Sequence, residues 1–137
     1  MNLKYLKVKH KFLMWCMEDY TSLFSLLSFV EEFYEYEELE LLKTTTLNIA
    51  KDLLEEEAIQ AGFLKNENSI EIWEKDVNSI IKDIKCQWDN LDRPLYFHEI
   101  VWFTTTVKGV IEFEKLNSVP EITNVDTFYL DNKKESF

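Results

Sequence analysis

Few side chains of this chain have the types and spacing that chemistry requires. His98 precedes Glu99, and such a pair can act as a general acid and a general base. Neither His98 nor His10 has a further partner at a catalytic spacing, and a histidine beside a glutamate at a strand edge is usually ordinary surface. The serines at 25, 28 and 79 fall in helical segments, without the strained turn that exposes a nucleophile. We therefore expect no catalytic residues and no enzymatic activity.

Carboxylates occur next to one another in three clusters, Glu31-Glu32, Glu37-Glu38 and Glu55-Glu56-Glu57. A calcium loop places its carboxylates at alternating positions and bends at a glycine. Neighbouring residues on a helix instead point about 100° apart, so these clusters cannot converge on one ion. We predict neither a metal site nor a cofactor.

The two cysteines, Cys16 and Cys86, are far apart and have no metal-like spacing. We expect both to be reduced, buried thiols, as is typical of cytosolic proteins. No apolar run approaches the roughly 20 residues of a membrane span. The apolar stretch Phe12–Met17 follows several lysines, but it is short for a signal peptide and Glu18 stands where a small-residue cleavage site would be. These features predict a cytoplasmic protein with no membrane partner.

The most distinctive segment is the run Glu31–Glu40, which contains six acidic and three aromatic side chains. No lysine or arginine occurs between Lys11 and Lys43, and the whole chain has a net charge of −11. So negative a field repels nucleic acid and anionic membranes and attracts basic proteins at long range. We expect no nucleic-acid partner, which agrees with the presence of a single arginine, Arg93.

Two interpretations of this run remain open. The first is a solvated helix face without further function. In the second, carboxylates spaced along a helix, with tyrosines among them, imitate a phosphate backbone with exposed bases and bind a protein built to hold nucleic acid. The partner-binding residues predicted by the second interpretation are Glu31, Glu32, Tyr34, Glu35, Tyr36 and Glu38.

The composition favours a folded domain rich in helix. Hydrophobic residues make up 46% of the 137 residues and aromatic residues 15%, which is too apolar for a disordered chain. Only two glycines and two prolines are present, so few turns are expected. We predict a single α+β domain over residues 1–137, mainly α, with three or so helices and a small antiparallel sheet toward the C-terminal half.

Apolar residues spaced by three and four predict the helices, over residues 19–34, 38–61 and 70–88. Gly62 stands where a left-handed helix cap would end the second helix. Asn68 and Glu71 resemble a capping pair before the third helix.

The remaining segments are less regular. Residues 98–106 are rich in strand formers and predict a strand, which Lys108-Gly109 would break. Residues 110–116 fit either a second strand or a short helix. Residues 3–12 fit either a short strand or an irregular arm, and such an arm would span residues 1–11. We expect order at 125–130 and a frayed tail at 131–137.

The segment from Asp52 to Gly109 resembles winged-helix-type domains. The resemblance lies in a helix, then Ala61-Gly62-Phe63-Leu64, then a strand closing on Thr106-Val107-Lys108-Gly109. It implies a winged-helix-like arrangement. A winged helix that reads DNA needs a basic recognition helix, whereas the helices here are acidic or neutral, so we expect no DNA reading.

The chain is short, acidic and lysine-rich, and it contains the predicted strand Glu99-Ile100-Val101-Trp102-Phe103. In this overall character it resembles immunity proteins of bacterial contact-dependent inhibition and related polymorphic-toxin systems. Those families neutralise nuclease toxins by binding them. The resemblance implies a monomer or weak dimer that occludes the active site or substrate groove of a basic toxin domain, and it carries over no specific residue. The alternative is an acidic regulator that acts through protein contacts.

Overall fold

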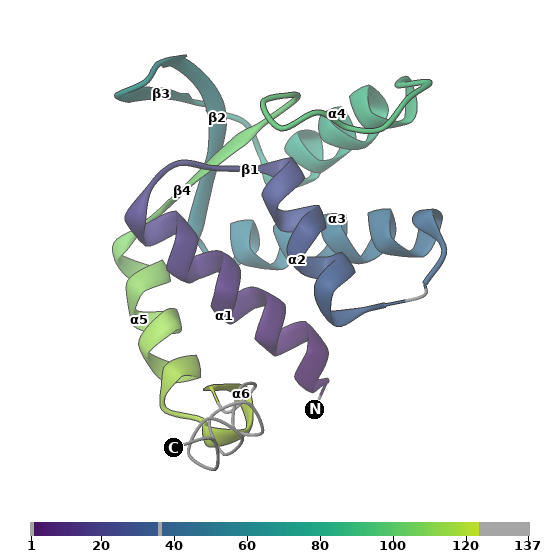
Figure 1. Cartoon of the computed structure of the whole chain (residues 1–137). Helices are drawn as coiled ribbons and strands as arrows, with labels where there is room; N and C mark the ends of the chain where they lie inside the picture. The colour runs from purple at the N-terminus through teal and green to yellow at the C-terminus, as the bar shows by residue number, and fades with distance from the viewer. Residues whose placement is uncertain (1, 36, 124–137) are drawn as a thin grey trace, which may run out of the picture.

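The computed structural model describes residues 2–35 and 37–123 of the chain (Figure 1). Its elements, in chain order, are α1 Leu3–Glu18, β1 Thr21–Ser22, α2 Leu23–Phe33, α3 Leu39–Glu55, β2 Ile59–Asn66, β3 Ser69–Ile72, α4 Val77–Asp89, β4 Trp102–Thr105, α5 Val107–Asn117 and α6 Pro120–Thr123. The α+β class, mainly helical with a small antiparallel sheet, is confirmed. There are six helices in the described part instead of three. The segments predicted at 125–130 and 131–137 lie outside the described residues.

The sheet has four strands in the order β1-β4-β2-β3, and every neighbouring pair is antiparallel. β2 and β4 form its centre, with Ala61 opposite Phe103 and Gly62 opposite Trp102. In Figure 1 the β2–β3 hairpin extends beyond the helices, while α1 crosses the molecule between α2 and α5. No helix of the described part is both long enough and apolar enough to cross a membrane.

Helix α1 corrects the prediction of a strand or arm at the start of the chain. Val8, Phe12 and Cys16 are spaced by four, and their side chains are buried on one face of the helix. The Phe12 ring meets Phe103 of β4 edge-on, with centroids 5.5 Å apart. The alternating lysines between these residues suggested a strand, but the burial of every fourth residue requires a helix.

Long-range side-chain contacts also tie α1 to α3 and α5. The Tyr5 hydroxyl donates to the Asp52 carboxylate, and Lys9 Nζ lies 2.9 Å from Glu56 Oε1. On the other side of α1 the His10 ring stacks on Phe113 of α5, with centroids 4.9 Å apart. The first helix is therefore covered largely by elements from later in the chain.

Helix α3 ends at Glu55, so the prediction of a helix as far as residue 61 was wrong. The helix is closed by hydrogen bonds from Glu57 N to Leu54 O (3.0 Å) and from Ala58 N to Leu53 O (2.9 Å). Glu57 has a φ of 57°, in the left-handed conformation that usually calls for glycine at this position. A glutamate gives no sequence signal for such a stop.

Gly62 lies within strand β2 and does not cap a helix. A Cβ on Gly62 would lie 2.1 Å from the carbonyl oxygen of Glu71 on the adjacent strand β3. The segment that resembled the end of a helix is therefore the middle of β2, which needs a residue without a side chain at this point of close approach.

Helix α4 begins at Val77 and not at residue 70, because Asp76 caps it by accepting a hydrogen bond from Ser79 N (2.8 Å). The predicted capping pair Asn68–Glu71 is therefore wrong, and residues 69–72 form β3. Ile80, Ile84 and Trp88 form the buried stripe of α4.

Residues 110–116 belong to a helix, α5, which settles the alternative left open by the sequence. Thr106 caps α5 by accepting from Gly109 N (3.0 Å), so Thr106–Gly109 starts a helix and does not close a strand as the winged-helix resemblance implied. The strand predicted over 98–106 is shortened to Trp102–Thr105.

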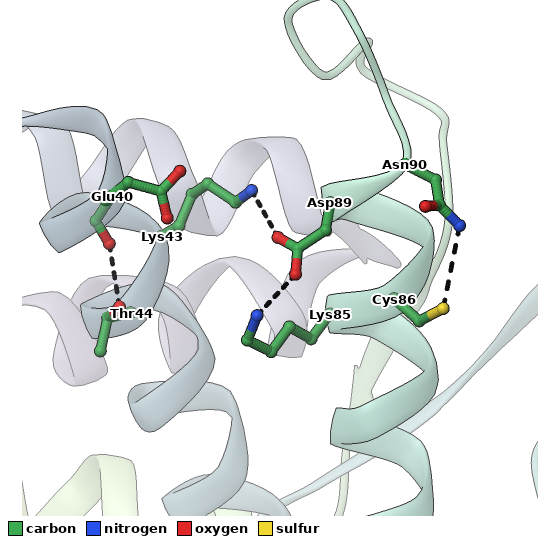
Figure 2. Close-up of polar contacts among 7 residues, drawn as sticks. All are labelled: Glu40, Lys43, Thr44, Lys85, Cys86, Asp89 and Asn90. Atoms are coloured by element: carbon green, nitrogen blue, oxygen red, sulfur yellow. Dashed lines mark hydrogen bonds and ion pairs between the residues drawn. The ribbon is translucent and has the colours of Figure 1, made fainter.

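Helices α3 and α4 pack against each other through polar as well as apolar side chains. Figure 2 shows Lys43 of α3 and Lys85 of α4 reaching the same carboxylate, that of Asp89. Lys43 is only 8% exposed although it carries a charge. This ion pair fixes the start of α3 against the end of α4.

Candidate functional site

The acidic run spans the junction between α2 and α3 and does not form one continuous helix. α2 ends at Phe33, and Tyr34 leaves the helical conformation with φ −117° and ψ 50°. α3 begins at Leu39, so only the two ends of the run are helical. The expectation that these carboxylates repeat at a regular helical rise is therefore wrong for the middle of the run. Tyr36, one of the predicted site residues, lies outside the described residues.

Three of the predicted site residues come together at this junction. Glu31, Tyr34 and Glu35, with Leu42 of α3, line an open hollow of about 500 Å³, which we call the acidic hollow. The other two described residues lie elsewhere. Glu32 faces α1, where its Oε2 is 2.6 Å from Lys11 Nζ, and Glu38 is an exposed residue at the start of α3.

The negative charges of the acidic run Glu31–Glu40 are largely uncompensated. Within residues 2–35 and 37–123, Glu32 alone of the acidic side chains in this run forms an ion pair. The exposed carboxylates without such a pair there are those of Glu31, Glu35, Glu37, Glu38 and Glu40. Exposed carboxylates without counter-charges favour the approach of a cation.

Tyr34 forms a fixed wall of the hollow. It is half-buried against the hydrophobic core, and burial raises the pKa of its phenol. Lys4 Nζ lies 5.6 Å from the centroid of its ring, on the side of α1. The ring is thus held by the fold, and Glu31 and Glu35 are the exposed charges beside it.

A second exposed group was not predicted from the sequence. The segment between α4 and β4, residues 91–101, is here called the aromatic loop. Its Tyr96 is 52% exposed and its Phe97 is 54% exposed. The Phe97 ring contacts Trp102 edge-on, with centroids 5.5 Å apart, and Phe24 of α2, with centroids 6.0 Å apart. The only sequence signal was a pair of large aromatics, Tyr96 and Phe97, shortly after Pro94.

A dense set of interactions fixes the conformation of the aromatic loop. Both Arg93 nitrogens Nη1 and Nη2 donate to the Glu99 carboxylate, at 2.7 and 2.8 Å. The same carboxylate accepts from Tyr96 N at 2.7 Å, and the Arg93 guanidinium lies 3.9 Å above the Tyr96 ring. Bidentate pairing of this kind is among the strongest polar contacts in proteins. It holds the loop closed at its base.

Backbone strain is present in the same loop. Ile100 has a φ of 72°, and Val101 N donates to Glu99 O at 2.9 Å. Together these describe a γ-turn with positive φ, a form that is rare and strained. A β-branched residue in this conformation is an outlier. Such strain persists where the surroundings hold it in place, and it is common at functional sites.

His98 and Glu99 lie in the aromatic loop, where the Glu99 carboxylate is bound by Arg93. His98 is an exposed residue of the loop and is not on a strand edge as predicted. The Arg93 guanidinium lowers the pKa of Glu99 to about 2, so its carboxylate has no proton to donate near neutral pH. Within residues 2–35 and 37–123, no three side chains of His, Cys, Asp or Glu are grouped so that they could hold a metal ion.

The cysteines are both free thiols, but only one is buried. Burial raises the pKa of Cys16 to about 12, whereas Cys86 is exposed on α4. The prediction that both are buried was therefore wrong for Cys86. That residue lies on the outer side of α4, away from the stripe of Ile80, Ile84 and Trp88.

Comparisons of this chain with protein-family models, with curated proteins and with solved structures found no match. The resemblance to immunity proteins therefore remains a prediction.

Proposed function

We propose that this chain is an inhibitor of the immunity type, which binds and neutralises a basic toxin domain, most plainly a nuclease. The observation that carries the proposal is the acidic hollow, where Glu31 and Glu35 stand exposed and without ion pairs in the described chain beside the fixed ring of Tyr34. The chain would act in the cytoplasm and by binding alone.

The charge of a nuclease makes it a suitable partner. A protein that binds nucleic acid must neutralise phosphates with lysine and arginine, so its substrate groove is basic. An acidic surface with a net charge of −11 behind it attracts such a groove at long range and accelerates the encounter. A lysine or arginine of the toxin that enters the acidic hollow would meet two carboxylates and an aromatic wall.

Inhibition would follow from occlusion. Once the acidic hollow covers the basic groove, the phosphates of the substrate cannot reach it. Because the groove must be basic to hold its substrate, the toxin could not lose its affinity for the inhibitor without losing affinity for nucleic acid as well.

The test is co-expression of the chain with the toxin domain encoded beside its gene, combined with binding kinetics at two salt concentrations. The variant Glu31→Lys/Glu35→Lys should fold normally and associate with the toxin at least tenfold more slowly, with loss of growth protection. The matched control is Glu67→Lys/Glu74→Lys, which makes the same charge change at exposed residues on either side of β3, outside the acidic run. Equal association rates for the two double variants would contradict the proposal.

A further inference from the structure

We infer that the aromatic loop and Phe24 form a second half of the docking surface, and that its occupant is a basic protein face that places arginine side chains against the exposed rings. The inference rests on the proposed function for its partner, a basic protein, but it assigns a different set of residues and a different chemistry from those of the acidic hollow.

The two halves lie on the same side of α2. Phe24 and Glu31 are seven residues apart in this helix, almost two full turns, so they point in nearly the same direction about 10 Å apart along the axis. Phe24 contacts Phe97 of the aromatic loop, and Glu31 lines the acidic hollow. Ser28 lies between them, with its hydroxyl folded back onto Phe24 O at 2.9 Å. One partner face can therefore contact both groups.

The rings of this patch are exposed and already held in place. Phe97 is 54% exposed and Phe24 36% exposed, and each is fixed by the contact with the other. Trp102, which is only 8% exposed, packs edge-on against the Phe97 ring. Aromatic side chains that are exposed but ordered before binding lose little conformational freedom on association, which is the property of an interface anchor.

The chain itself contains an example of the contact that we infer. The Arg93 guanidinium lies 3.9 Å above the ring of Tyr96 while both its nitrogens bind a carboxylate. Arginine is suited to this double role because its planar group stacks on rings and pairs with carboxylates, whereas lysine offers only a point charge. Separate arginines of one partner face could stack on Phe97 and pair with the carboxylates of the acidic hollow.

Two peptides of equal length and charge serve as probes, one alternating arginine with glycine and the other lysine with glycine. We expect calorimetry at low salt to give about three- to fivefold tighter binding of the arginine peptide to the wild type. Phe97→Ala should remove this preference. Phe97→Leu, which keeps an apolar side chain but has no aromatic face, should remove it as well and serves as the folding control.

The charge variant Glu31→Gln/Glu35→Gln separates the two proposals. It should weaken both peptides by a similar factor and leave the arginine preference unchanged. Loss of affinity in this variant without any arginine preference in the wild type would overturn the inference and leave the proposed function standing. A preference that depends on Phe97, combined with no effect of the charge variant, would support the inference about the aromatic rings and contradict the role proposed for the acidic hollow.

Sedimentation of the unliganded protein tests whether a second copy of this chain covers the patch instead. We expect no self-association that depends on Phe97. A dimer that dissociates in Phe97→Ala would overturn the inference, because the patch would then be covered by a second copy of this chain.

Discussion

Lys43 is held between a carboxylate and a ring. Its Nζ lies 2.8 Å from Asp89 Oδ1 (Figure 2), and it lies 5.2 Å from the centroid of the Trp88 ring. Asp89 also accepts from Lys85 at 2.5 Å, and these two lysines lower the pKa of its carboxyl, Lys43 more than Lys85. Because Lys43 is almost buried, Asp89 is the counter-charge that offsets the desolvation of its ammonium group. Asp89 is half-exposed and has a second cation.

This asymmetry predicts unequal effects of removing either partner. Asp89→Asn should lower the melting temperature more than Lys43→Met, because the first variant leaves a buried ammonium group without a counter-charge and the second keeps the apolar stem in place. Thermal unfolding of both variants checks this prediction, with Lys85→Met as the control for the exposed lysine. A larger loss in Lys43→Met would show that the ion pair does not govern the packing of α3 on α4.

The Arg93–Glu99 pair predicts how the aromatic loop responds to acid. The folded-state pKa of Glu99 is about 2, below its usual 4.5, so the pair contributes stability above about pH 4.5 and loses it as the pH falls toward 2. Glu99→Gln should therefore melt below the wild type at pH 7, and the difference should disappear near pH 2. Melting curves across this range are the measurement, and Glu74→Gln, which removes an exposed carboxylate without an ion pair in the described chain, is the control. A difference that is independent of pH would contradict the assignment.

The left-handed residue at the end of α3 predicts a stabilising substitution. Glu57→Gly relieves the positive φ, whereas Glu57→Ala keeps the steric conflict, and both remove the exposed pair with Lys108. The glycine variant should be more stable than the alanine variant by about 1 kcal/mol. Urea unfolding of the two variants gives this difference directly, and equal stabilities would mean that the turn relaxes without glycine.

The two thiols should react at very different rates. Cys86 is exposed, whereas Cys16 is buried and its pKa is raised to about 12, so almost no thiolate exists there at pH 8. Alkylation followed by mass spectrometry should give one rapid modification at Cys86, and a second only when the protein unfolds. Two rapid modifications of the native protein would show that the core around Cys16 opens readily.

The sequence predicted elements best where one face of a helix is apolar over its whole length. The stripes of α2 and α4 were recognised because their buried residues recur at three and four. The stop at Glu57 was missed because its residue type gives no signal for a left-handed turn. Beyond that stop, Ile59 and Ala61 continue the apolar pattern of α3 by chance, and only pairing with β4 makes them a strand.

The candidate site was predicted only where it is local in sequence. Glu31, Tyr34 and Glu35 lie within two turns of one another, so their proximity follows from the helix and its end. The contact between Phe24 and Phe97 joins residues 73 positions apart and depends on the path of the aromatic loop. That path is set by one arginine, one glutamate and a strained isoleucine, and no single-sequence pattern indicates such a path.

The position of α1 has a consequence for the way in which the protein must be made. The ribosome completes this helix before it synthesises several of the partners that cover it. Phe12 packs on Phe103, which is made much later. His10 contacts Phe113 and also Asn117, which is 107 residues further along the chain. Until then, of the elements that pack on α1 in the described structure, only β1, α2 and α3 have been made. Native docking of α1 is therefore completed only after β4 and α5 have been synthesised. A nascent chain that stalls before α5 would leave that face partly uncovered and open to chaperones or proteases.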